Sequence, residues 1–201
     1  KAANKQALMQ EFSLDPKLTA APLLGMVTRL ADQKGLDLLA AILPELMTLD
    51  LTLVILGTGD QKYHDLLTRA AQTYRGRLGV KIAFDNRLAH LIEAGADMFL
   101  MPSHYEPCGL NQIYSLKYGT IPVARAVGGL VDTIEPVDLQ NQTGTGFLFQ
   151  EPTPDAFLAC LRQALAAYQD KKRWRKLMQR AMSQDFSWEN SAKAYVELYH
   201  Q

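Results

Sequence analysis

The sequence has few cysteines and no net charge, and each absence excludes a class of protein. Only two of the 201 residues are cysteines, and positions 108 and 160 match neither a CxxC pair nor a metal-ligand spacing. We therefore expect both to be reduced thiols in a cytoplasmic protein. Lys and Arg number 21, as do Asp and Glu, so the formal net charge is zero. A broad cationic surface for nucleic acid or an anionic membrane is not expected.

Long apolar runs are also missing. None approaches the roughly 20 residues of a membrane-spanning helix, and residues 1–11 lack the apolar segment of a signal peptide. The chain does not begin with Met and opens inside a polar pattern that predicts a helix, so we expect a fragment of a longer protein. Its length and its 48% hydrophobic content are ordinary for a globular fold, and they predict one domain over residues 1–201.

What the sequence does contain is an alternation of apolar strand-like runs with helical patterns. Strands are predicted at 22–27, 51–56, 80–84, 97–101, 121–124 and 146–149, and helices at 35–49, 61–74, 87–94, 109–118, 154–168, 173–182 and 189–199. Because most of the strands are apolar throughout, the sheet should be parallel and covered by helices on both faces. This α/β, Rossmann-like doubly wound fold binds ligands at the carboxyl ends of its strands.

Two cations follow the first predicted strand. Arg29 comes directly after it, and Lys34 stands where the next helix begins. A helix N-terminus offers free N–H groups and a partial positive charge, and a guanidinium can bind phosphate through two hydrogen bonds. The arrangement suits a diphosphate, although two cations in a surface loop are an equally good interpretation.

Glycines follow the second and fifth predicted strands. Gly57 and Gly59 lie in a strand-to-helix turn, and Gly128 and Gly129 open a second one. Glycine lets the backbone approach a ligand closely, and Thr133 could bond a phosphate oxygen, although ordinary turns use the same residues. The third glycine of a dinucleotide fingerprint and the acidic residue that would hold a ribose are both missing, which argues against a nucleotide-dependent oxidoreductase.

The segment after the fourth predicted strand, PSHYEPCGLNQ, is the most unusual in the chain. The carboxylate of Glu106 could accept hydrogen bonds from sugar hydroxyls. The N–H groups of Cys108, Gly109 and Leu110 could donate to other hydroxyls, so that together they hold a polyhydroxylated ring. A single glutamate before a helix is, however, more often just tolerated there. No pattern of His, Asn or Asp supports Cys108 as a nucleophile.

The motifs occur in a familiar order. RLADQKG, LGTGD, PSHYEPCGLNQIYSLKYGTIPV, VGGLVDT and DFSWENSAKAYVELY together resemble the C-terminal domain of bacterial glycogen synthases and plant starch synthases. The resemblance covers nearly the whole chain, and EPCGL followed by Gln and LKYG is its most specific part. It implies one half of a GT-B glycosyltransferase, the half that binds ADP-glucose. The other half, an N-terminal domain with a KTGGL loop, a catalytic histidine and the acceptor groove, is expected to be absent from this chain.

The resemblance also implies residue roles. Arg29 and Lys34 match the pair that neutralises the donor diphosphate, and Glu106 matches the carboxylate that contacts the transferred glucose. Phe84 matches the residue beside the adenine, where the family often has Tyr. The rest of the implied donor site comprises Gly57, Gly59, Cys108, Gly109, Leu110, Gly128, Gly129 and Thr133. Tyr114 stands where many relatives of this fold carry a second glutamate, which places the closer likeness with the EPCGL branch.

The implied reaction transfers glucose from ADP-glucose to the non-reducing end of an α-1,4-glucan, with retention of configuration and without a cofactor. The chain has no Asp-x-Asp motif, and Arg29, Lys34 and a helix N-terminus could stabilise the leaving diphosphate without a metal. The implied location is the bacterial cytoplasm, or the plastid stroma in a plant. Two alternatives stay open: a non-catalytic nucleotide- or sugar-binding module, and a related transferase that uses UDP-glucose.

Overall fold

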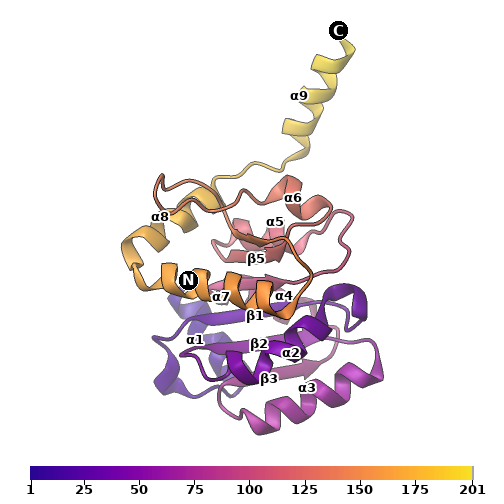
Figure 1. Ribbon diagram of the computed structural model, residues 1–201. Helices are drawn as coiled ribbons and strands as arrows, with labels where there is room; N and C mark the ends of the chain where they lie inside the picture. Colours follow the sequence, from indigo (N-terminus) through magenta and orange to yellow (C-terminus); the bar gives the residue numbers. More distant parts are fainter. Residues whose placement is uncertain (201) are drawn as a thin grey trace.

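Six parallel strands form a single sheet in the order β3-β2-β1-β4-β5-β6 (Figure 1). The strands are β1 (Leu23–Val27), β2 (Thr52–Gly57), β3 (Leu78–Ile82), β4 (Met98–Met101), β5 (Ile121–Arg125) and β6 (Phe147–Phe149). The computed structural model describes residues 1–200. The strand order reverses between β1 and β4, and in such sheets a ligand crevice forms at that point, outside the carboxyl ends of the strands. The predicted doubly wound fold is confirmed.

Helices cover both faces of the sheet. They are α1 (Ala2–Glu11), α2 (Leu36–Leu46), α3 (Gln61–Thr73), α4 (Asn86–Gly95), α5 (Asn111–Lys117), α6 (Gly129–Thr133), α7 (Pro154–Gln169), α8 (Lys171–Met182) and α9 (Trp188–Tyr199), with the short 3-10 helices η1 (Pro16–Leu18) and η2 (Asp32–Lys34). Within residues 1–200, no helix is both long enough and apolar enough to cross a lipid bilayer.

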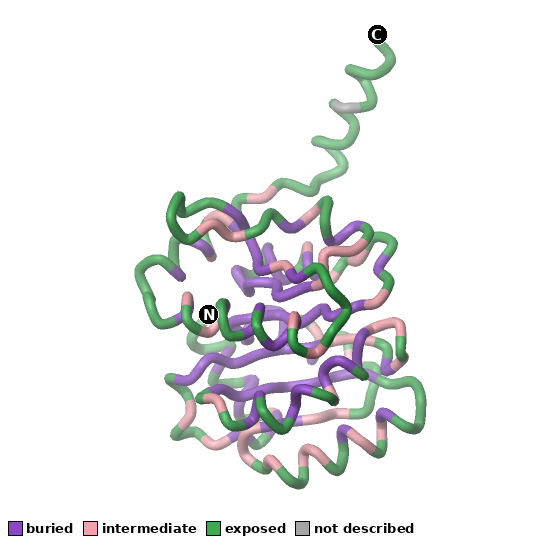
Figure 2. Tube along the Cα trace, viewed as in Figure 1, coloured by how far each residue is buried: buried purple, intermediate pink, exposed green. Residues whose placement is uncertain are grey.

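Each face of the sheet has its own hydrophobic core, because successive side chains of a strand point to opposite faces. Leu24 and Leu53 belong to the core that includes α2, α7 and α8. Leu23 and Val54, their neighbours in sequence, belong to the core that includes α1 and α4. The strands are therefore apolar along their length because both of their faces are buried (Figure 2).

Several predicted boundaries are wrong by two or three residues. The helix predicted at 35–49 ends at Leu46, and the helix predicted at 173–182 begins at Lys171. The strand predicted at 80–84 is β3, Leu78–Ile82, so Phe84 lies beyond it in a loop. Gly79 reads as a strand breaker in the sequence, but it leaves room for Phe12, whose side chain would lie 2.7 Å from a Cβ added to Gly79. The helix predicted from residue 109 begins instead at Asn111, because Gly109 has a φ of +76° and cannot be part of a right-handed helix.

Helix α9 extends away from the rest of the fold (Figures 1 and 2). Its large apolar side chains are exposed, with Trp188 at 89% and Tyr199 at 82% of full exposure. The prediction that the apolar face of the last helix lies exposed in this chain is confirmed. Both cysteines are free, as predicted, and burial raises the pKa of the Cys160 thiol to about 12.

Candidate functional site

Two adjoining cavities open at the carboxyl ends of the central strands. The larger, about 350 Å³, is lined by residues that follow β1, β2 and β3 and by residues of α4 and α5. The smaller, about 110 Å³, lies between the ends of β1 and β4. Val27, Thr28 and Asn111 line both cavities. Their combined size falls within the about 300–1,000 Å³ typical of small-molecule sites, and they lie at the predicted switch point of the sheet.

The smaller cavity contains an ion pair between two predicted site residues. The Nζ atom of Lys34 lies 2.6 Å from Oε2 of Glu106, and only 17% and 8% of the two side chains are exposed. The hydroxyl of Ser103 donates a second hydrogen bond to the same carboxylate oxygen, at 3.2 Å. The structure thus brings together the cation predicted to bind a phosphate and the carboxylate predicted to bind a sugar.

Arg29 lines the larger cavity rather than the smaller one. It is exposed, and its Nη2 atom donates to Oε1 of Gln33 at 3.2 Å. The two predicted cations therefore belong to different cavities, on either side of the boundary that Thr28 and Asn111 form. An anionic group bridging the two cavities would pass between Arg29 and Lys34.

Gly57 and Gly59 let two site loops pack against each other. A Cβ added to Gly57 would lie 1.9 Å from the carbonyl oxygen of Thr28, and one added to Gly59 would lie 2.4 Å from that of Leu30. The backbone N–H of Leu30 donates to the carbonyl of Thr58, which joins the same loops. The close approach predicted toward a ligand is thus made to the neighbouring loop, although Gly57 also lines the larger cavity.

Gly128 and Gly129 let their own loop pack closely against the EPCGL loop. A Cβ on Gly128 would lie 2.0 Å from the carbonyl oxygen of Glu106, and one on Gly129 would lie 2.4 Å from that of Cys108. The N–H of Gly129 also donates to the carbonyl of Glu106 at 3.1 Å. These glycines therefore hold the backbone around Glu106 in place, and contact with a ligand stays a prediction for them.

Gln112, which the sequence did not single out, fastens the EPCGL loop to α6. Its fully buried amide nitrogen donates to the carbonyls of Cys108 and Gly109 and to the hydroxyl of Thr133, at 3.0, 3.1 and 3.1 Å. Thr133 in turn donates its single hydroxyl proton to the carbonyl of Gly129 at 2.6 Å. The role of Thr133 toward a phosphate oxygen stays a prediction, and without a ligand its hydroxyl is hydrogen-bonded to Gln112 and Gly129.

The N–H groups of Cys108, Gly109 and Leu110 are available to donate to a ligand, as their predicted role requires. Across residues 1–200, none of the three donates to another protein group. Leu110 lines the smaller cavity beside Glu106. These amides can therefore serve as donors to a ligand, and that role stays a prediction.

Other residues that sequence reasoning missed hold the loops. Arg125 donates to the carbonyl of His104 at 2.8 Å, and Gln33 donates to that of Tyr105 at 3.1 Å. Arg125 ends β5, so the strand-end rule could have found it. His90 and Glu93 of α4 also line the larger cavity, and no motif marked them in the sequence.

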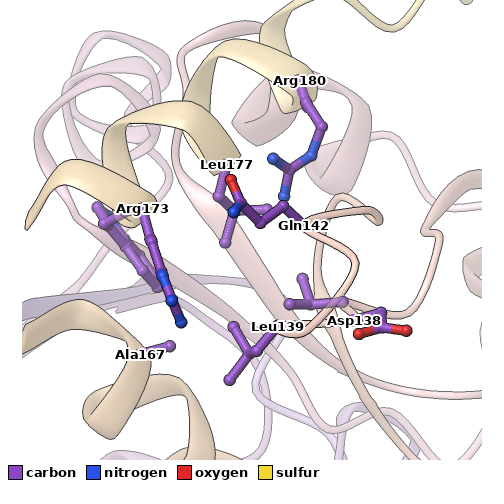
Figure 3. Close-up of a pocket in the computed structure, with 9 residues that line it drawn as sticks. Asp138, Leu139, Gln142, Ala167, Arg173, Leu177 and Arg180 are labelled. Atoms are coloured by element: carbon purple, nitrogen blue, oxygen red, sulfur yellow. The ribbon is translucent and has the colours of Figure 1, made fainter. Parts of the chain in front are cut away.

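A third crevice lies far from these strand ends, between the loop after α6 and helices α7 and α8 (Figure 3). Leu139 and Ala167 border it, with Arg173 and Arg180 at its edge. Arg180 is already bonded to the carbonyl of Gly144 at 3.1 Å. The volume is about 20 Å³, room for about one water molecule, so it is not a candidate site.

A doubly wound sheet with cations around its switch-point cavities defines an α/β domain suited to phosphorylated ligands. The chain matches the family described as "Glycosyl transferases group 1" over residues 12–180, and it belongs to that family. It is 54% identical to the glycogen synthase of Anaeromyxobacter dehalogenans (strain 2CP-C) over 199 residues, which are 99% of the chain and 42% of that protein. It is 50% identical to the glycogen synthase of Koribacter versatilis (strain Ellin345), with 99% and 41% covered.

The fold matches that of a solved synthase. The catalytic domain of starch synthase IV from Arabidopsis thaliana, bound to ADP and acarbose, superposes with a TM-score of 0.88 and 33% identity, over 98% of this chain and 42% of that one. The predicted resemblance and the GT-B-like fold are thereby confirmed. The chain spans about two fifths of the length of these relatives.

Proposed function

We propose that this domain holds the ADP-glucose donor of a glycogen synthase. The complete protein would transfer glucose to the non-reducing end of an α-1,4-glucan, with retention of configuration. One observation carries the proposal: the Lys34–Glu106 pair occupies a cavity that adjoins a larger one at the switch point of the sheet. The similarity to glycogen synthases and to a starch synthase bound to ADP supports it.

The two cavities accommodate the parts of the donor separately. The nucleoside lies in the larger cavity beside Phe84. Phe84 is 92% exposed, so its ring is free to stack on a base. The diphosphate crosses between Arg29 and Lys34. The glucose lies in the smaller cavity, where Glu106 accepts hydrogen bonds from its hydroxyls and the N–H groups of residues 108–110 donate to them.

The same groups explain the chemistry. Cleavage of the bond between glucose and phosphate leaves negative charge on the diphosphate, which Arg29 and Lys34 stabilise. The carboxylate of Glu106 stabilises positive charge that develops on the sugar ring. Two cations and free backbone amides are sufficient for this step, so the proposal includes no metal and no cofactor.

The acceptor is bound by a part of the protein outside this chain. The relatives are more than twice as long as the chain, which leaves room for a separate N-terminal domain. We infer that this domain contains the glucan groove and completes the active site, so the chain alone binds nucleotide and does not transfer glucose. We propose a bacterial cytoplasm as the location of the complete protein, and the similarity to bacterial glycogen synthases supports this.

Calorimetric titration of this chain with ADP, AMP and UDP tests donor binding. ADP should bind about 10-fold or more tighter than AMP, because its second phosphate gains charge-assisted hydrogen bonds of about 1.5–3 kcal/mol. Lys34→Met should reduce that preference. Arg162→Gln, which removes a surface cation of α7, should leave it unchanged. Equal affinities for ADP and AMP would contradict the diphosphate assignment, and tighter binding of UDP would favour a UDP-glucose transferase.

Transfer is tested on the complete protein. Mixed with ADP-glucose and maltodextrin, it should release ADP and lengthen the glucan, whereas this chain should do neither. Binding without transfer by the complete protein would support the alternative of a non-catalytic module.

A further inference from the structure

One wall of the larger cavity contains two ionisable side chains from consecutive turns of α4. Glu93 is buried, with 2% of its side chain exposed, and its Oε2 atom lies 3.1 Å from Nδ1 of His90. The imidazole of His90 is about half exposed. Both residues line the cavity together with Tyr114 of α5.

A buried carboxylate with so few partners is costly in a folded protein. Among the described residues, His90 is the only hydrogen-bond partner of the Glu93 carboxylate. Burial raises the pKa of Glu93, and the neighbouring His90 opposes that shift. Perturbed carboxylates beside a cavity tend to mark functional sites, because a purely structural position is usually better filled by an apolar side chain.

The contact with Glu93 favours one tautomer of His90. With Glu93 ionised and the ring neutral, Nδ1 carries the hydrogen that the carboxylate accepts, and Nε2 is left as an acceptor. Two aromatic rings pack edge-on against the imidazole, Tyr114 of α5 at 6.0 Å and Tyr118, which follows α5, at 6.3 Å between ring centroids. The ring is therefore oriented before a ligand arrives.

Two other polar side chains of this wall form hydrogen bonds within the protein. The amide nitrogen of Asn111 donates to the carbonyl of Val27 at 2.8 Å. The carboxylate of Asp85 accepts from the N–H of Leu88 at 2.9 Å and caps α4. The imidazole of His90 contacts Glu93 through Nδ1, and among the described residues no protein group is hydrogen-bonded to Nε2, which leaves that atom free to accept from a bound molecule.

We propose that Nε2 of His90 accepts a hydrogen bond from the nucleoside of the donor, and that Glu93 is the positioning residue that fixes the imidazole. This inference rests on the proposed function, which places the nucleoside in the larger cavity. A nucleoside offers two sources of such a donor, the exocyclic amino group of adenine and the hydroxyls of the ribose. Uracil has a carbonyl at the place of the amino group, so contact with the base would also favour ADP over UDP.

Calorimetry on this chain tests the contact. His90→Phe keeps an aromatic ring against Tyr114 and Tyr118 but removes the acceptor, and it should weaken ADP binding about 3- to 10-fold, the value of one neutral hydrogen bond. Glu93→Met, which leaves the imidazole without its partner, should also weaken binding. Glu93→Gln should restore it to nearly the original affinity, because the amide oxygen still accepts from Nδ1. Thermal melting of each variant shows whether it is folded.

Three analogues identify the group that His90 contacts. They are 2′-deoxy-ADP, 3′-deoxy-ADP and the diphosphate of purine riboside, which lacks the amino group. The analogue without the relevant donor should bind the original chain more weakly and should be insensitive to His90→Phe. ADP affinity unchanged in a folded His90→Phe variant, or an equal loss with ADP and all three analogues, would overturn the inference. A chain that binds no ADP at all would instead overturn the proposed function.

Discussion

Lys34 and Glu106 form a largely buried ion pair, with Nζ and Oε2 2.6 Å apart. The proposed reaction uses both, one for the diphosphate and one for the sugar. The structure therefore shows how these residues are kept in place by one another, by Ser103 and by the backbone contacts around Glu106. Removing the charge of Glu106 while keeping the size of its side chain should therefore affect the chemistry more than the fold of the loop.

We expect Glu106→Gln in the complete protein to lower turnover about 100-fold or more, the loss typical of one preorganised electrostatic group. The change keeps the size of the side chain and removes its charge. ADP affinity should not fall, because Lys34 becomes free to bind the diphosphate. Steady-state kinetics and calorimetry measure the two effects, with the exposed Glu151→Gln as control. Turnover close to the original would remove Glu106 from the reaction, and a parallel loss of ADP binding would indicate a disordered loop.

Glu93 allows a prediction about pH and stability. Its folded-state pKa is raised above the ordinary value of 4.5, mainly by burial. A raised carboxyl pKa stabilises the fold at low pH, and this contribution is lost as the pH rises through the ordinary value toward the folded one. Glu93→Gln has no such loss. Its melting temperature should exceed that of the original chain by a few °C at about pH 7, and the difference should shrink toward about pH 4.

Thermal melting across that pH range measures the difference. The exposed Glu151→Gln again serves as the control, because a carboxylate in water has no burial cost to lose. A Glu93→Gln variant that is less stable than the original at neutral pH would show that the carboxylate with His90 is a net stabilising pair.

The strand-end rule predicted which side chains gather at the carboxyl ends of the strands, but not the contacts between their loops. It identified Arg29, Lys34 and Glu106 because carboxyl ends of parallel strands meet at one edge of the sheet. It did not predict that Gly128 packs against the carbonyl of Glu106, or that the hydroxyl of Thr133 donates a hydrogen bond to the carbonyl of Gly129. These contacts join loops that follow different strands, and a local pattern contains no information about which loops touch.

At the scale of elements, a buried ion pair attaches α1 to the sheet. Lys5 is buried, and its Nζ atom lies 2.7 Å from Oδ2 of Asp97 and 2.6 Å from the carbonyl of Ala21. The same carboxylate oxygen accepts from the N–H of Leu23 at 2.9 Å. The first helix is thus fastened to the amino ends of β1 and β4, at the edge of the sheet opposite the site.

Lys5→Met should destabilise the chain by about 3 kcal/mol or more, because it leaves the carboxylate of Asp97 buried without its cation. Lys62→Met is the matched control, since Lys62 and Asp32 form an ion pair whose side chains are 57% and 68% exposed. An exposed pair contributes about 0–1 kcal/mol. Urea unfolding of both variants measures the difference, and equal losses would show that burial adds nothing to the Lys5 pair.

Most elements could be predicted from the sequence because their apolar periodicity is strong. The central strands are short, continuous apolar runs, and the long helices have buried faces that repeat at the helical period. The short helices α6 and η2 were missed, since five and three residues are too few to show a period. The start of β3 was misplaced for another reason: Gly79 belongs to the strand because it leaves room for Phe12.

At the scale of the whole molecule, α9 extends away from the rest of the fold (Figure 1). Its described large apolar side chains, Trp188, Tyr195, Val196, Leu198 and Tyr199, are between 53% and 89% exposed. Monomeric proteins seldom leave so much contiguous apolar surface in water. In the GT-B arrangement that the resemblance implies, the C-terminal segment crosses to the N-terminal domain, which accounts for a face that this chain alone leaves uncovered.

We therefore expect this chain to self-associate through α9, while the complete protein covers the helix and shows no association through it. Sedimentation velocity over a range of protein concentrations should give a weight-average mass that rises with concentration. Replacing Trp188 and Tyr199 by serine removes the two most exposed rings of the helix and should shift the chain toward monomer. The same replacement of Tyr105, an exposed aromatic outside α9, is the control and should leave association unchanged. A chain that stays monomeric at the highest concentration would contradict the prediction, and association that survives the double replacement would locate the contact on another surface.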